Sequence, residues 1–284
     1  MTNGNSTETA TGSPEFSTIR FHVDKGVARI VLARPGALNA INPAMMRDLN
    51  AAMDIVDTDA AVKAVIISGE GRTFSAGFDL KAAAARGEMD GERWRAVLEE
   101  DLDLILRFWN SPKPTIAAVH GYCLGGAFEL MLACDIVVAA DSALLGAPEA
   151  KFGSGAVALL LPWVTGPKLA KEILFTGDDR LTSVRACQMG IVNEVVPDGD
   201  LEVRADRMAR RIVSSSPHAV KYLKRAINRT YDVMGFKEAV LQGLEIEIFL
   251  ESHRNAEREQ FDRIRQDEGL QAALAWRQAL SDVG

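Results

Sequence analysis

The chain has 284 residues, of which 48% are apolar and 25% are charged, and its net charge is −7. Such a length and apolar content suffice for a packed core in one large domain, or in a core with a smaller appendage. The acidic balance argues against a nucleic-acid-binding protein, and no apolar run approaches the roughly 18 residues of a membrane span.

The sequence shows no sign of a targeting peptide, a disulfide or a metal site. Residues 1–16 contain no arginine and lack the basic start and apolar stretch of a signal peptide, so we expect a disordered tail on a cytoplasmic protein. The cysteines stand in apolar or small-residue runs, which predicts buried free thiols at Cys123, Cys134 and Cys187. Because no histidine has metal-ligand spacing with another His or Cys, we expect no metal site.

The first elements predict a hairpin followed by a helix and a strand. Two β-rich runs in residues 20–33 flank the turn sequence Asp24-Lys25-Gly26. Apolar residues then recur at intervals of three and four, which predicts a helix over residues 43–58. The run VKAVIISG predicts a strand over residues 62–69.

The same order of elements recurs along the middle of the chain. A glycine-containing loop precedes a helical pattern around residues 94–105 and a strand at 115–121. A second glycine loop, a helix over 126–134 and a strand over 135–140 follow, with a further short strand just after. Serial strand, loop and helix units predict an α/β fold with parallel strands, because parallel neighbours need a crossover.

The strand pattern ends near residue 198. Residues 200–282 predict three or four helices, including one charged amphipathic stretch from about Lys237 to Arg265. We expect an all-helical C-terminal region there.

Two glycine loops could present backbone N–H groups to a ligand. They are FSAGFDLK at 74–81 and HGYCLGGAFEL at 120–130, where Gly125 and Gly126 open a helix whose first N–H groups lack internal partners. Two such loops can converge on one oxygen, although each alone also fits ordinary turn chemistry. Neither loop matches a phosphate-binding or dinucleotide-binding signature.

Two acids stand next to these features. Glu129 lies in the first turn of the helix that Gly126 opens, where it could serve the helix dipole or chemistry. Glu149 follows Pro148 beside an apolar strand, where it could be a solvated loop acid or a functional carboxyl.

Several ordered segments together carry a family resemblance. From about Phe21 to Asp198 the chain resembles the enoyl-CoA hydratase/isomerase (crotonase) superfamily, with weaker similarity further on. The segments are RPGALNAI, FSAGFDLK, AAVHGYCLGGAFELMLACDIVVA, GAPE and FTGDDRLTSVRACQMGIVNEVV. The resemblance implies an α/β spiral of repeated ββα units over residues 17–199 and a helical trimerisation region over 200–284, assembled as a homotrimer or a dimer of trimers.

The resemblance also implies roles for individual residues. The N–H groups of Phe78 and Gly126 would form an oxyanion hole for the carbonyl of an acyl-CoA thioester. Glu149 would exchange a proton at Cα and Glu129 would act on the water, with no cofactor besides coenzyme A in the substrate. The CoA and substrate contacts would be Ala37, Leu38, Ser75, Ala76, Gly77, Asp79, Leu80, Lys81 and Gly125.

Two departures from the family pattern bear on binding. Many relatives carry lysine where this chain has Gly36, so one cation for the CoA phosphates is missing. The loop after Glu149 is apparently three residues shorter than in hydratases. Leu160, Leu161 and Trp163 beyond it would form either an apolar acyl surface or part of the core.

Three alternatives to a hydratase stay open. An isomerase, or an acyl-CoA hydrolase or lyase, could use the same fold, but the retained glutamate pair favours hydration. A non-catalytic CoA-binding or RNA-binding protein is disfavoured by the acidic balance, and the basic run at 218–229 has the pattern of a solvated helix face. A serine hydrolase using Ser75 or Ser154 lacks a G-x-S-x-G motif.

Overall fold

A computed structural model describes residues 15–87, 89–253 and 255–281. The predicted tail therefore lies outside the described residues up to residue 14. No helix in the described ranges is long and apolar enough to cross a membrane. The cytoplasmic location stays a prediction.

The main sheet begins with the predicted hairpin. Strands β1 (Ile19–Asp24) and β2 (Val27–Leu32) pair antiparallel, and Lys25 and Gly26 between them both have positive φ, 48° and 82°. Two successive positive φ values are typical of the tight turn that matches the right-handed twist of a hairpin. The turn composition thus predicted this connection correctly.

The rest of the main sheet is parallel, as the serial strand and helix units predict. Its order is β1-β2-β3-β4-β6-β9, with each neighbour after β2 paired in parallel. The further strands are β3 (Ala64–Gly69), β4 (Thr115–Val119), β6 (Ile136–Ala140) and β9 (Glu194–Val196). Strands β3 and β4 are almost wholly buried, which explains their continuous apolar runs.

A second, three-stranded sheet makes the ββα units. Its order is β5 (Tyr122–Leu124), β7 (Leu144–Gly146) and β8 (Leu181–Thr182). The chain passes from β4 to β5 at Gly121, where φ is 56° and an added Cβ would lie 2.1 Å from the Arg72 carbonyl oxygen. Glycine is required there because no side chain fits.

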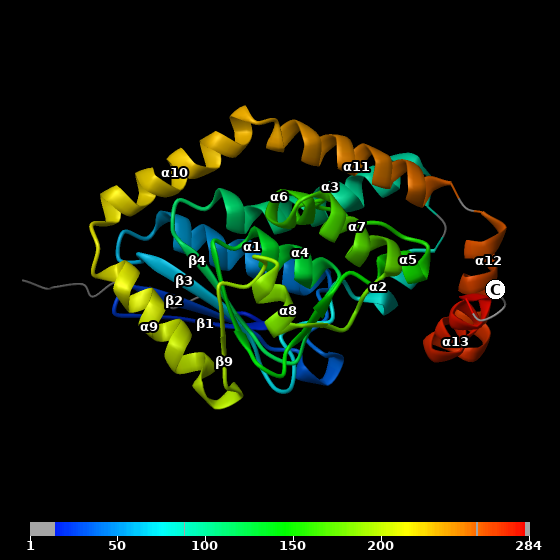
Figure 1. The fold of residues 1–284 in the computed structure, drawn as a ribbon, viewed down its shortest axis with the longest axis horizontal. Helices are drawn as coiled ribbons and strands as arrows, with labels where there is room; N and C mark the ends of the chain where they lie inside the picture. Colours follow the sequence, from blue (N-terminus) through cyan, green and yellow to red (C-terminus); the bar gives the residue numbers. More distant parts are fainter. Residues whose placement is uncertain (1–14, 88, 254, 282–284) are drawn as a thin grey trace, which may run out of the picture.

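Helices cover both faces of the main sheet (Figure 1). Helix α9 (Leu201–Val213) packs against β3, β4 and β6, and α1 (Pro43–Thr58) packs against β1 and β2. Asn42 begins α1 by accepting a hydrogen bond from the Met45 N–H, with Pro43 as the first helical residue. The other helices before α9 are α2 (Leu80–Ala84), α3 (Gly91–Asn110), α4 (Gly126–Ala133), α5 (Glu149–Phe152), α6 (Leu161–Thr165), α7 (Pro167–Thr176) and α8 (Ser183–Gln188), with 3₁₀ turns at Pro35–Ala37 and Asp198–Asp200.

The C-terminal region contains five described helices where three or four were predicted. After α9 come α10 (Pro217–Val233), α11 (Phe236–Ser252), α12 (Ala256–Glu268) and α13 (Leu270–Ser281). The single helix predicted from Lys237 to Arg265 is wrong, because the chain leaves the helical region at His253. Asn255 then begins α12 by accepting from the Arg258 N–H.

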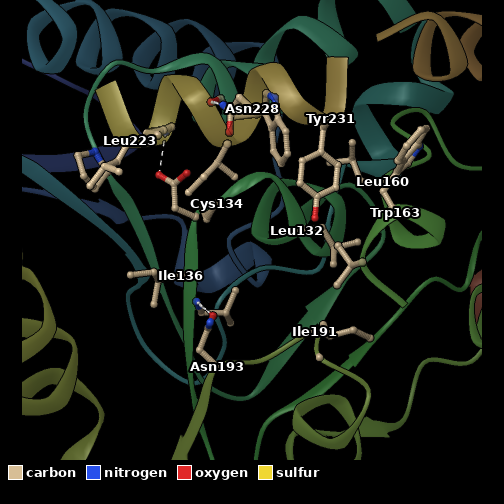
Figure 2. Close-up of a pocket in the computed structure, with 18 of the residues that line it drawn as sticks. Leu132, Cys134, Ile136, Leu160, Trp163, Ile191, Asn193, Leu223, Asn228 and Tyr231 are labelled. Atoms are coloured by element: carbon tan, nitrogen blue, oxygen red, sulfur yellow. Dashed lines mark hydrogen bonds and ion pairs between the residues drawn. The ribbon is translucent and has the colours of Figure 1, made fainter. Parts of the chain in front are cut away.

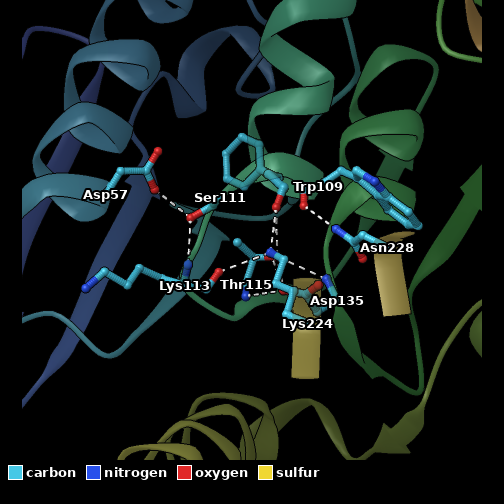
Figure 3. A network of polar contacts seen from close by, with 9 residues as sticks. Asp57, Trp109, Ser111, Lys113, Thr115, Asp135, Lys224 and Asn228 are labelled. Carbon is cyan, nitrogen blue, oxygen red and sulfur yellow. Dashed lines mark hydrogen bonds and ion pairs between the residues drawn. The ribbon is translucent and has the colours of Figure 1, made fainter. Parts of the chain in front are cut away.

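Helix α10 is fixed to the core by one buried ammonium group (Figure 3). Lys224 Nζ donates to the carbonyl oxygens of Phe108 and Lys113, at 3.1 Å each, and pairs with Asp135 Oδ2 at 2.8 Å. Asp135 Oδ2 also accepts from the Thr115 N–H at 2.7 Å. All three donor positions of the lysine are therefore used, so its burial is compensated by hydrogen bonds.

The predicted free thiols are confirmed. Cys123 and Cys134 are buried and Cys187 is half-buried, so the burial prediction holds for two of the three. Burial raises the pKa of the Cys123 thiol. Among the residues that the structure describes, no group of three or more His, Cys, Asp or Glu side chains is arranged to hold a metal ion.

Candidate active site

The first glycine loop is held between two other segments by backbone hydrogen bonds. The Ala76 N–H donates to the Leu38 carbonyl at 3.0 Å, and the Ile41 N–H donates to the Gly77 carbonyl at 2.8 Å. On the other side the Ser75 N–H donates to the Tyr122 carbonyl at 3.0 Å. The fold therefore brings the predicted CoA-contacting segments, residues 37–38 and 75–81, to one place.

The two glycine loops meet at Gly77 and Gly126. Gly77 has a φ of 88°, and an added Cβ there would lie 3.1 Å from the Gly126 nitrogen and 2.5 Å from the Leu124 carbonyl oxygen. Neither the Phe78 N–H nor the Gly126 N–H has a hydrogen-bond acceptor within the described part of the chain. Two free backbone donors on adjoining loops, one of them at the positive end of α4, form a natural site for an oxygen that gains negative charge.

The side chain of Phe78 covers the start of α4. A Cβ added to Gly126 would lie 2.3 Å from both Cδ2 and Cε2 of the Phe78 ring. Only glycine fits at position 126 while the ring stays there.

Glu129 is a buried carboxyl with one backbone partner. It lies in the first turn of α4 and is 5% exposed, and its Oε2 accepts from the Ala158 N–H at 3.0 Å. Burial raises the pKa of Glu129 well above its usual range, and the charges of Glu149 and Glu247 raise it further. A surface acid that only serves the helix dipole would not be buried in this way.

Glu149 lies beside Glu129 and is not a solvated loop acid. It is the first residue of α5, its Oε1 would be 2.8 Å from a Cβ added to Gly125, and its Oε2 is buried with no hydrogen-bond partner among the described residues. Burial raises the pKa of Glu149 to about 7, and the charge of Glu247 acts in the same direction. A buried oxygen without a partner points to a group that a ligand would satisfy.

Among the other residues predicted to contact CoA, Ser75 and Asp79 make hydrogen bonds within the protein, whereas Lys81 is exposed to solvent. Ser75 is fully buried, and its hydroxyl donates to the Asn39 carbonyl and accepts from the Gly77 N–H. Asp79 caps α2 and pairs with Arg34 at 3.0 Å. Lys81 is exposed at the start of α2, and no described acid pairs with it.

Sequence reasoning missed several charged residues that surround the glutamate pair. Asp101 on α3 is 5% exposed, its Oδ1 has no described partner, and burial raises its pKa to about 7. Glu247 and Glu251 on α11 are 4% exposed each. Helical spacing could have indicated the two α11 acids, because they share a stripe with the buried Val240, Leu244 and Ile248.

A cavity of about 560 Å³ lies between α10 and the core, and it contains neither glutamate (Figure 2). Leu160 and Trp163 line it, and Trp163 packs against the Phe236 ring with centroids 5.3 Å apart. Leu160 and Leu161 are buried. Leu160 and Trp163 thus line a cavity that neither glutamate lines, and the acyl-surface and core interpretations of the apolar run both stay predictions.

Comparisons with known proteins agree with this architecture. The enoyl-CoA hydratase/isomerase family model matches residues 22–274. A crystal structure of an enoyl-CoA hydratase/isomerase from Xanthobacter autotrophicus Py2 has 46% sequence identity and a TM-score of 0.91, and the match covers 93% of this chain and 98% of that one. The α/β spiral with C-terminal helices is therefore a crotonase fold, as predicted.

Sequence comparison with curated proteins points to the same family. A probable mitochondrial enoyl-CoA hydratase of Dictyostelium discoideum is 34% identical, covering 77% of this chain and 78% of the relative. A carnitinyl-CoA dehydratase of Escherichia coli (strain K12) is 39% identical, covering 75% and 80%. The chain belongs to the enoyl-CoA hydratase/isomerase family and is a crotonase-family enzyme, which implies an acyl-CoA substrate.

Proposed function

We propose that the protein is an enoyl-CoA hydratase, which adds water across the conjugated double bond of a 2-enoyl-CoA thioester. The observation that carries the proposal is the pair of carboxyls next to two backbone N–H groups without acceptors among the described residues: Glu129 is buried, and Glu149 is half-buried with a buried Oε2 that has no described partner. Hydration needs both features at once, since charge develops on the thioester oxygen while a proton and a hydroxyl are added to adjacent carbons.

The N–H groups of Phe78 and Gly126 would bind the thioester oxygen. Attack of water at Cβ moves an electron pair through Cα to that oxygen as an enolate, and both donors stabilise it. Removing one donor of this kind typically costs about 3 to 4 kcal/mol of barrier lowering. Because both donors are main-chain N–H groups, a phenylalanine side chain at position 78 leaves the donors of the oxyanion hole in place.

The two glutamates would divide the proton transfers. Glu129, as carboxylate, takes a proton from the water that forms the Cβ–O bond, and Glu149, as neutral acid, gives its proton to Cα. The raised pKa of Glu149, about 7, supports this role, because an acid near neutrality still holds its proton at working pH. Burial raises the pKa of Glu129 as well, so the two carboxyls would share one proton. The hydrogen bond from the Ala158 N–H lowers the pKa of Glu129 and so favours the negative charge on Glu129 and the proton on Glu149.

The reaction assay tests the proposal directly. We expect crotonyl-CoA and longer 2-enoyl-CoAs to lose their conjugated absorbance in the presence of the protein. Binding of CoA thioesters without hydration of any would contradict a hydratase and leave an isomerase, hydrolase or lyase.

Dehydration is the second candidate function, and the 39% identical carnitinyl-CoA dehydratase supports it. 3-Hydroxyacyl-CoAs such as carnitinyl-CoA test it, because their dehydration would produce the conjugated absorbance that hydration removes.

The rate should depend on pH through the acid. Because Glu149 must carry its proton and its pKa is about 7, we expect kcat/KM to fall as pH rises through about 7. A stopped-flow pH–rate profile between pH 5 and 9 measures this limb, and a control with butyryl-CoA binding shows whether affinity changes instead. A rate that stays flat to pH 9 would remove Glu149 as the acid.

CoA itself would be held by backbone at Ala37 and Leu38 and around residues 75–81, with Gly125 beside Glu149. Lys81, exposed and without a described acidic partner, would contact a phosphate. Gly36 is exposed, a Cβ added there would meet no described atom within 4 Å, and a glycine has no side chain to supply a cation.

The chain would assemble as a trimer or a dimer of trimers through its C-terminal helices. Large apolar side chains lie exposed there: Leu223, Ile227, Val233, Met234, Ile246 and Phe249. Such exposure on adjacent helices supports an interface. Light scattering should give three or six times the 30.8 kDa chain mass, and a monodisperse monomer would contradict the proposal.

A further inference from the structure

The loop after Glu149 is tied to the C-terminal helices as well as to Glu129. The Gly155 N–H donates to Glu247 Oε1 at 3.0 Å, and Arg258 Nη1 on α12 donates to the Gly153 carbonyl at 2.7 Å. Ala158, three residues after Gly155, donates its N–H to Glu129 Oε2. Helices from the last part of the chain thus fix the same short loop that orients a proposed catalytic carboxyl.

Glu247 fits this loop closely. A Cβ added to Gly155 would lie 2.1 Å from Glu247 Oε2, so the loop backbone and the carboxyl are in direct contact. The Ser154 hydroxyl donates to Glu251 Oε1 at 2.5 Å and lies 3.4 Å from Glu247 Oε1. The contact therefore requires both a glycine at 155 and the acid on α11.

The charge of Glu247 is not compensated by a direct ion pair among the described residues. The nearby guanidinium, Arg258, pairs with Glu251 at 2.8 Å and lies near Asp262 at 3.9 Å. Burial raises the pKa of Glu247 to about 7, with the Glu251 charge acting in the same direction and Arg258 opposing it. The charge of Glu247 in turn disfavours ionisation of both Glu129 and Glu149.

We propose that Glu247 is a positioning residue of the active site: it fixes the 153–158 loop through Gly155 and sets a third buried carboxyl beside Glu129 and Glu149, which keeps a proton on the pair. The role in catalysis rests on the proposed function; the effect on the carboxyls does not. The charged groups that act on Glu129, Glu149 or Glu247 come from five helices, Asp101 on α3, Glu129 on α4, Glu149 on α5, Glu247 and Glu251 on α11 and Arg258 on α12.

Replacing Glu247 by glutamine separates charge from hydrogen bonding, because the amide oxygen still accepts from Gly155. Carbon-13 NMR of protein labelled at the glutamate carboxyls, with the Glu149 signal assigned by its loss in Glu149→Gln, follows the titration without substrate. We expect the Glu149 titration to move to lower pH by about half a unit or more in Glu247→Gln. The alkaline limb of the pH–rate profile should move by the same amount.

The matched control is Glu245→Gln, the same change on the same helix. Glu245 is exposed and pairs with Arg95 on the surface, so its replacement should leave the Glu149 titration unchanged. A Glu149 titration in Glu247→Gln that superimposes on that of the wild type overturns the proposal. A shifted titration in a protein that hydrates no enoyl-CoA would instead refute the hydratase and keep Glu247 beside the pair.

A second variant covers the case in which Glu247→Gln does not fold. Gly155→Ala keeps every charge but forces the Glu247 carboxyl away from the loop. Because small displacements of a catalytic group have large kinetic effects, we expect kcat to fall at least about tenfold with KM nearly unchanged. Full activity with an unchanged Glu149 titration in Gly155→Ala would likewise overturn the proposal.

Discussion

Glutamine in place of Glu129 or of Glu149 is expected to lower kcat for crotonyl-CoA hydration about 10²- to 10⁴-fold, the usual contribution of a positioned acid or base. Each carboxyl transfers one proton in the proposed mechanism, and neither can replace the other because Glu129 acts on the water that attacks Cβ whereas Glu149 acts on Cα. The amide of Glu129→Gln can still accept from the Ala158 N–H, so the fold should be retained.

Steady-state kinetics with crotonyl-CoA measures this loss, with butyryl-CoA binding and the circular dichroism spectrum as checks on structure. The exposed Glu245→Gln serves as the matched control and should keep wild-type activity. A large loss in only one variant would indicate single-carboxylate chemistry, as in an isomerase. Near-wild-type rates in both would refute the assignment of the pair.

Alanine at Gly126 is expected to lower kcat about 10²- to 10³-fold, the effect of losing one oxyanion-hole donor. The new Cβ would lie 2.3 Å from two atoms of the Phe78 ring, so either the ring or the start of α4 must move. Both movements disturb the N–H groups at positions 78 and 126 that are proposed to bind the thioester oxygen.

A second substitution distinguishes this steric cause from a general effect of alanine. Phe78→Ala keeps the backbone N–H and removes the ring, so the double variant Phe78→Ala/Gly126→Ala should recover at least about tenfold of the lost rate, since contacting residues couple in double-mutant cycles. Gly199→Ala, where an added Cβ meets no atom of the described residues within 4 Å, is the control. Additive losses in the double variant would contradict the ring contact as the cause.

The parts of the fold that the sequence predicted well are those that local patterns determine. The Asp24-Lys25-Gly26 turn predicts the hairpin, and the apolar spacing over residues 43–58 predicts the bounds of α1. The glycine loops were recognisable because strand, glycine and helix follow one another in the chain. Glu129 and Glu149 stood out through their places next to those loops and through the family resemblance.

What the sequence could not provide depends on contacts between distant segments. The break between α11 and α12 has no proline or glycine to mark it, and only the Asn255 cap indicates it. Glu247 looks like one more charge in an amphipathic helix, because its partner Gly155 lies 92 residues earlier. Helical spacing places Glu247 on the buried stripe of α11, but no local pattern shows that the stripe packs over this loop.

The tie between Glu247 and Gly155 also has a consequence for the order in which the protein matures. During synthesis the ribosome completes both glutamates and both glycine loops well before it reaches α11. At about 5 to 20 residues per second, some 5 to 20 seconds separate Ala158 from Glu247. On the proposed role of Glu247, the nascent chain carries every proposed reacting group before it carries the residue that fixes their loop, so the active site would be complete only after α11 has been synthesised.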